Sequence, residues 1–134
     1  MNRENIEIKK LTLSEKIKMA KNPNTSLTML KTLANEENLK LKAWIAKHPK
    51  SDAELLETLS KHEDPIVKSV VANNPNTSGK TLAKLAESKD VIVLLSVAGN
   101  TNTPTFVLEE LAKHENEIIK NKAQQTLKKN KVTK

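Results

Sequence analysis

Residues 64–90 read DPIVKSVVANNPNTSGKTLAKLAESKD, and this segment carries the signals of two short helices joined by a tight turn. Asp64 followed by Pro65 suits an N-cap with proline at the first helical position, so a helix is predicted to begin there. Pro75 ends that helix, because the residue before a proline is pushed out of the α region. Thr77 is then predicted to be the N-cap of a second helix. The segment therefore predicts a helical hairpin.

The same pattern recurs along the chain every 26 residues. Its apolar columns are Ala20, Ala46, Ala72 and Ala98; Leu30, Leu56, Leu82 and Leu108; and Leu33, Leu59, Leu85 and Leu111. A fixed period of this size is typical of repeat proteins, in which each unit buries its apolar face against its neighbours. The predicted fold is an all-α helical-repeat solenoid, an α-α superhelix of four 26-residue two-helix repeats plus a capping helix.

Capping residues recur at two positions of the repeat. Those predicted for the first helices are Thr12, Asn38, Asp64, Asp90 and Asn116, and those predicted for the second helices are Thr25, Ser51, Thr77 and Thr103. Glu15 stands three residues after Thr12, and Glu54 stands three residues after Ser51, which is the spacing of a capping box. Pro104 is expected at the first position of its helix.

The whole chain is predicted to be one helical-repeat domain. Its expected parts are an N-terminal cap (1–12, with apolar Ile6, Ile8 and Leu11), the repeats (13–117), a C-terminal capping helix (118–129) and a frayed polar tail (130–134).

The segment 71–78, continuing to Leu82, Leu85 and Ala86, resembles the variant leucine-rich repeat of bacteria, and altered forms of the signature occur at 20–25 and 46–51. The resemblance covers roughly residues 13–125. It implies a HEAT- or armadillo-like superhelix without β-strands, with a mixture of α and 3₁₀ helices. One type of member in this family carries an iron–sulfur cluster in a cysteine-rich segment. This chain contains no Cys, so that feature does not carry over and no cofactor is predicted.

Composition gives little support for catalysis. Without Cys, disulfides and thiolate sites are excluded. Two of the three histidines, His62 and His114, share a position two repeats apart, and a solenoid would not bring them together. There is no glycine-rich loop, HExxH motif or nucleophile elbow. We predict no catalytic residues, no metal site and no enzyme activity.

The sequence shows no signal peptide and no run of about 18 apolar residues that would span a membrane. The expected location is the cytoplasm, and the expected oligomeric state is a monomer.

The net charge of +7 comes almost entirely from lysine, since Arg3 is the only arginine. One repeat position carries Lys16, Lys42, Lys68 and Lys120, interrupted by Leu94. Because one position forms one stripe down a solenoid, these lysines are predicted to line up as a basic stripe for phosphates or for an acidic partner. The alternative interpretation is a solvated helix face.

A second repeat position carries Asn22, His48, Asn74 and Asn100, at the ends of the first helices. Armadillo-like proteins use an asparagine ladder to hold an extended peptide, so a similar binding role is one interpretation. The other is structural: these side chains cap free carbonyls or bridge adjacent repeats. Trp44 is predicted at the rim of the molecule, either as a binding hot spot or as a partly buried packing residue.

These observations favour a noncatalytic binding or scaffold module that engages a protein partner, of acidic character, through its repeat surface. The alternative is sequence-tolerant binding of a duplex nucleic-acid backbone through the lysine stripe. Specific base reading depends on arginine, and single-strand binding depends on rows of aromatic residues. This chain offers neither. A purely structural spacer is the third reading.

Overall fold

A computed structural model describes residues 8–132, and all secondary structure in this range is α-helical, without strands or 3₁₀ helices. The first helix of each repeat is called an A helix: α2 (Leu13–Lys21), α4 (Leu39–Lys47), α6 (Pro65–Asn73), α8 (Val91–Gly99) and α10 (Glu117–Val132). The second is called a B helix: α3 (Leu27–Leu33), α5 (Ala53–Ser60), α7 (Gly79–Leu85) and α9 (Thr105–Leu111). The mixture with 3₁₀ helices that the resemblance implied is not found in the described residues.

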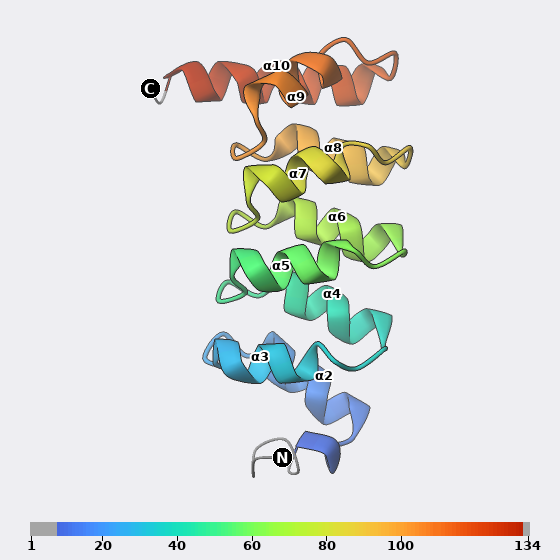
Figure 1. The fold of residues 1–134 in the computed structure, drawn as a ribbon, viewed down its shortest axis with the longest axis vertical. Helices are drawn as coiled ribbons and strands as arrows, with labels where there is room; N and C mark the ends of the chain where they lie inside the picture. The colour runs from blue at the N-terminus through green and yellow to red at the C-terminus, as the bar shows by residue number, and fades with distance from the viewer. Residues whose placement is uncertain (1–7, 133–134) are drawn as a thin grey trace.

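The helical hairpins stack into a column with the two ends of the chain at opposite ends (Figure 1). The A helices pack directly on one another along the whole column, whereas successive B helices contact one another little. The predicted alanine column lies where the A helices meet, with each alanine at most 1% exposed. Both leucine columns of the B helices are buried as well. The predicted solenoid is therefore confirmed.

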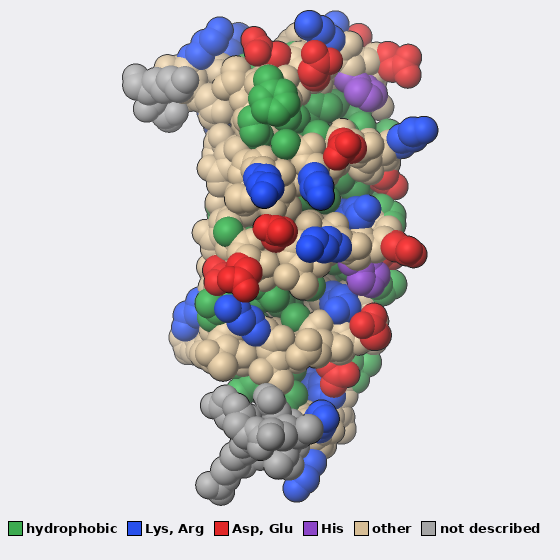
Figure 2. All heavy atoms as spheres, in the orientation of Figure 1, with side chains coloured by type: hydrophobic (Ala, Val, Ile, Leu, Met, Phe, Trp, Pro, Cys, Tyr) green, Lys and Arg blue, Asp and Glu red, His purple; other side chains and the backbone are tan. Residues whose placement is uncertain are grey.

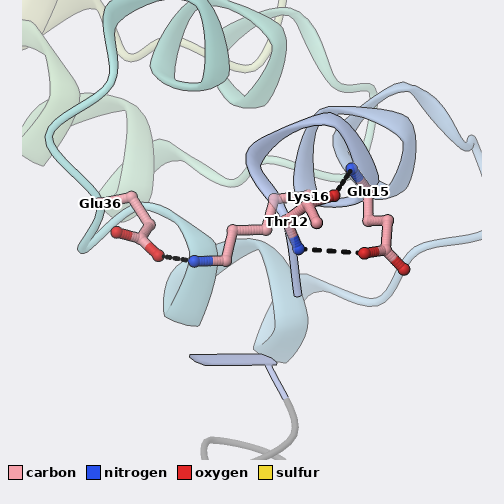
Figure 3. A network of polar contacts seen from close by, with 4 residues as sticks. All are labelled: Thr12, Glu15, Lys16 and Glu36. Carbon is pink, nitrogen blue, oxygen red and sulfur yellow. Dashed lines mark hydrogen bonds and ion pairs between the residues drawn. The ribbon is translucent and has the colours of Figure 1, made fainter. Parts of the chain in front are cut away.

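The A helices begin where the sequence predicted. Thr12 forms a complete capping box with Glu15: the Thr12 N–H donates to Glu15 Oε1 at 3.0 Å, and the Glu15 N–H donates to Thr12 Oγ1 at 3.1 Å (Figure 3). The other four predicted caps also accept backbone N–H bonds with their side chains; they are Asn38, Asp64, Asp90 and Asn116.

The predicted caps of the B helices are wrong by one residue. The N-caps are Ser26, Asp52, Ser78 and Pro104, of which the first three accept a backbone N–H bond. The predicted Ser51–Glu54 capping box is therefore absent. The residues predicted as caps instead bond to the preceding A helix. Each of their hydroxyls donates at 2.6–2.7 Å to a carbonyl six residues earlier; the residues are Thr25, Ser51, Thr77 and Thr103. These hydroxyls join the end of each A helix to the turn that follows.

At the C-terminal end, α10 continues to Val132, beyond the predicted helix end at residue 129. Asn130 belongs to the helix instead of stopping it, and its Nδ2 donates to the Thr101 carbonyl at 3.2 Å. This bond holds the expected tail against the preceding repeat. At the other end, Ile8 is buried in the core as predicted, whereas Ile6 lies outside the described residues.

Candidate binding surface

The outward side of the A helices differs in charge from the rest of the molecule. We call it the A face and define it by four repeat positions: Ser14, Lys40, Ile66, Ile92 and Ile118; Ile17, Ala43, Ser69, Leu95 and Asn121; Lys18, Trp44, Val70, Ser96 and Lys122; and Lys21, Lys47, Asn73, Gly99 and Gln125. None of these residues is Asp or Glu. Every formal charge on the A face is therefore positive.

Three hollows follow one another along the A face. The first, of about 480 Å³, lies between α2 and α4 and includes Lys18, Lys21 and Lys40. The second, of about 180 Å³, shares Lys21 with the first and contains Trp44. The third, of about 420 Å³, shares Lys47 with the second and extends to Val70 and Asn73 on α6. Because neighbouring hollows share residues, they form one track across three repeats, which we call the A-face groove.

Trp44 lines the second hollow, and two lysine ammonium groups lie close to its ring. The ammonium of Lys21 is 4.7 Å from the ring centroid, and that of Lys47 is 5.2 Å from it. Both distances are within the range of a cation–π interaction, which holds each ammonium over the ring. Trp44 is partly buried, in agreement with the predicted rim position. This part of the groove therefore combines an apolar ring with two positive charges.

The predicted basic stripe is not an exposed row. Lys16 and Lys42 are only 9% and 8% exposed, and both ammonium groups are engaged. Lys16 pairs with the carboxylate of Glu36 (Figure 3), and Lys42 donates to the Ala34 carbonyl at 2.7 Å.

The stripe position faces the gap between the A and B layers, where a long lysine stem is buried while its ammonium reaches the C-terminal end of a B helix. Leu94 is buried in that gap, Lys68 is half-buried, and the Lys120 ammonium lies 3.9 Å from Glu117 Oε1.

The asparagine column bridges adjacent repeats. Asn74 is buried, its Nδ2 donates to the Ala46 and His48 carbonyls at 2.8 and 3.3 Å, and its Oδ1 accepts the Asn76 N–H at 2.8 Å. Asn100 makes the corresponding three bonds one repeat later. Because both amide hydrogens are used, neither side chain has a donor left for a bound peptide.

At the first junction of the column, His48 replaces the amide. Its Nε2 lies 2.8 Å from the Asn22 carbonyl, and its Nδ1 accepts the Lys50 N–H at 3.0 Å. Asn22 itself is exposed, and its Oδ1 accepts the Asn24 N–H. The geometry thus matches the structural interpretation of this column.

The family model of the Leucine Rich Repeat Variant domain matches residues 15–74. This part of the chain is therefore similar to the leucine rich repeat variant family. The match covers two of the stacked hairpins and the A helix of the third, and the later hairpins repeat the same caps and amide bridges. In comparisons with curated proteins and with solved structures, nothing matches significantly.

The stacked hairpins contain a second ladder that was not predicted from the sequence. The Nδ2 of Asn76 donates to the Pro49 and Ser51 carbonyls, both at 3.0 Å, and that of Asn102 donates to the Pro75 and Thr77 carbonyls at 2.6 and 3.3 Å. The signal was present, because this position reads Asn24, Lys50, Asn76 and Asn102. Asn73 was also missed: it is exposed at the third hollow, and its amide makes no hydrogen bond with any described residue.

The opposite side of these repeats, formed by the B helices, has a mixed character (Figure 2). Lysine and glutamate side chains lie next to one another there, and Phe106 is 65% exposed. His62 and His114 accept backbone N–H bonds from Asp64 and Asn116, so they shape the loops between repeats. Among residues 8–132, no group of His, Asp and Glu is arranged to hold a metal ion, and no helix is long and apolar enough to cross a membrane.

Proposed function

We propose that this chain is a noncatalytic binding module that holds an acidic, partly apolar segment of a partner protein in the A-face groove. The observation that carries the proposal is the lining of the groove: four lysines and a tryptophan, with no carboxylate. The four lysines are Lys18, Lys21, Lys40 and Lys47. A repeat-domain family of this kind also suggests a binding or scaffold role.

The apolar part of the partner is inferred from the rest of the A face. Beyond the groove, successive A helices each expose an isoleucine at one repeat position: Ile66, Ile92 and Ile118 are 58%, 55% and 65% exposed. Contiguous exposed apolar surface bordered by polar residues is typical of protein–protein interfaces. A segment that runs along the A face would meet cations over α2 and α4, and apolar side chains from α6 onward.

Duplex nucleic acid is the less favoured partner. Two of the four lysines predicted for backbone contacts are buried and already engaged. The groove also offers apolar side chains and Trp44 beside its lysines, and a phosphate backbone would leave these uncovered. The exposed lysines could still attract a polyanion weakly, so nucleic acid belongs in the experiment as a competing outcome.

The test is a selection of random short peptides on the wild-type protein, followed by binding to Lys21→Glu/Lys47→Glu and Trp44→Ala. We expect enriched peptides that combine a run of Asp and Glu with Leu, Ile or Phe. They should bind the double variant at least tenfold more weakly, because two attractive charges become repulsive. The matched control is Lys89→Glu/Lys113→Glu, which reverses two exposed lysines outside the groove and should bind like wild type.

Three results would overturn the proposal: no enriched peptides, enriched peptides without acidic residues, or equal binding by the double variant. A labelled DNA duplex is measured in parallel at about 50 and 200 mM salt. If the duplex bound more tightly than every selected peptide and lost that affinity steeply with salt, nucleic acid would replace the protein partner.

A further inference from the structure

A separate hollow, of about 430 Å³, opens between α5 and α7, and Lys68 of α6 also lines it. Besides Lys68, its charged lining consists of Lys61, Lys80, Lys84, Glu57 and Glu87, and Ser60, Thr81 and Ser88 add hydroxyl groups. The lining thus carries four positive and two negative formal charges. Figure 2 shows lysine side chains gathered over α5 and α7. We call this hollow the B-side pocket, and it shares no residue with the A-face groove.

Lys68 differs from the lysines at the same repeat position before it. In the first repeat, Lys16 is neutralised by Glu36 (Figure 3). The residue that corresponds to Glu36 in the third repeat is Ser88, so the carboxylate is missing there. Lys42 uses the Ala34 carbonyl, but Lys68 makes no hydrogen bond or ion pair with any described residue. Half-buried Lys68 therefore lines the pocket without an ion-pair partner among the described residues.

The polar groups around Lys68 leave room for an external acceptor. The Ser88 Oγ accepts the Asp90 N–H at 3.1 Å, so its own O–H is free to donate into the pocket. The Ser60 hydroxyl is already used, because it donates to the Glu57 carbonyl at 2.5 Å. Glu57 and Glu87 line the pocket but form no ion pair with its lysines. The available donors are thus the lysine ammonium groups and the hydroxyls of Thr81 and Ser88, with the two carboxylates at the same lining.

We propose that the B-side pocket binds a phosphate monoester or free phosphate, held by Lys68 with the help of Lys61, Lys80 and Lys84. Ammonium groups are compact charges that suit phosphate oxygens, and partial burial of Lys68 protects the interaction from screening by salt. This inference goes beyond the proposed function, because it concerns a different surface and a different class of ligand.

The experiment follows the backbone amide signals of the protein by NMR during titration with inorganic phosphate and, separately, with a phosphoserine peptide. Chloride keeps the ionic strength constant. We expect saturable shifts at Lys61, Lys68 and Ser88. Lys68→Gln removes the central charge and should weaken binding by about tenfold. A stronger response to inorganic phosphate points to a free ion as the source, and a stronger response to the peptide points to a phosphorylated protein.

Ser88→Glu is the sharper variant, because it restores the carboxylate found in the first repeat and keeps Lys68. It should block phosphate while the protein stays folded, since the Lys16–Glu36 pair shows that the site accommodates this geometry. Lys120→Gln is the matched control at the same repeat position outside the pocket, and it should bind like wild type. Linear shifts without saturation, or equal binding by wild type, Lys68→Gln and Ser88→Glu, would overturn the proposal.

Discussion

The A helices and the B helices differ in how each meets the next helix of its own kind. Successive A helices pack closely on their alanine column, and amide bridges from Asn74 and Asn100 join α4, α6 and α8. At the first junction, His48 bonds to the Asn22 carbonyl. Successive B helices are held mainly through the A helices and leave the B-side pocket between α5 and α7. The A layer therefore supplies the continuous part of the column. The A-face groove, which crosses three repeats, therefore lies on the A helices. The B-side pocket, which lies between two helices, is formed by the B helices.

The largest expected effect tests the core that both layers share. Leu56 of α5 is fully buried, so Leu56→Ala should lower the free energy of unfolding by about 2–5 kcal/mol through lost burial and a residual cavity. Phe106→Ala is the control on an exposed B-helix position and should change stability by less than about 0.5 kcal/mol. Chemical denaturation measures both. Equal losses would show that the assignment of buried and exposed B-helix positions is wrong.

The next effect tests the amide bridges of the A layer. Asn74→Ala removes three hydrogen bonds and leaves buried carbonyls without their donor, so it should cost about 2–4 kcal/mol. Asn76→Ala removes bonds at a more exposed position and should cost about 1 kcal/mol. Denaturant titrations of both variants give the ranking. If Asn74→Ala were the milder change, packing alone would hold successive A helices together.

Much of this architecture was predictable, because the signals that define it are local. The caps of the A helices were correct since each is an isolated capping residue before an apolar run. The caps of the B helices were misplaced since Thr25–Ser26, Ser51–Asp52 and Thr77–Ser78 each offer two candidates side by side. Only the structure shows that the first residue of each pair is used by the preceding helix.

The candidate site was less predictable than the fold. Repeat arithmetic correctly placed Lys16 and Lys42 in one column, but it does not say which side of the helix that column faces. Because lysine is charged, these side chains were expected to be exposed to solvent. In the structure the lysine stem is buried, and only the ammonium contacts a polar partner. The A-face groove depends on side chains from α2, α4 and α6 that meet in space, and no single column predicts it.

A smaller effect compares the two glycines. Gly99→Ala in α8 should raise the free energy of unfolding by about 0.5 kcal/mol, because alanine favours the helix and restricts the unfolded chain. The new Cβ would meet only the flexible end of Lys122, at 2.9 Å from Cε. Gly79→Ala should bring no such gain, since its Cβ would lie 3.1 Å from the backbone oxygen of Asn102. Thermal denaturation distinguishes them, and an equal gain would contradict this account.

The smallest effect concerns the capping box of α2. The hydrogen bonds from Thr12, chiefly the one from its backbone N–H, lower the pKa of the Glu15 carboxyl below its ordinary value of 4.5. The carboxylate therefore contributes stability above pH 4.5, and this contribution is lost as the pH falls through the lowered pKa. Glu15→Gln should flatten this part of the pH dependence of Tm. An unchanged acid dependence would mean that Glu15 does not contribute.

The two amide ladders have a mechanical consequence. Asn74 and Asn76 both bond to backbone carbonyls of the preceding turn, and so do Asn100 and Asn102. All these bonds lie at the turns from A helix to B helix, along the left edge of the column in Figure 1. That edge resists stretching, while the edge with the loops from B helix to A helix lacks comparable ladders among the described residues. Bending of the column should therefore pivot about the bonded edge, and the spacing of successive loops from B helix to A helix would change most.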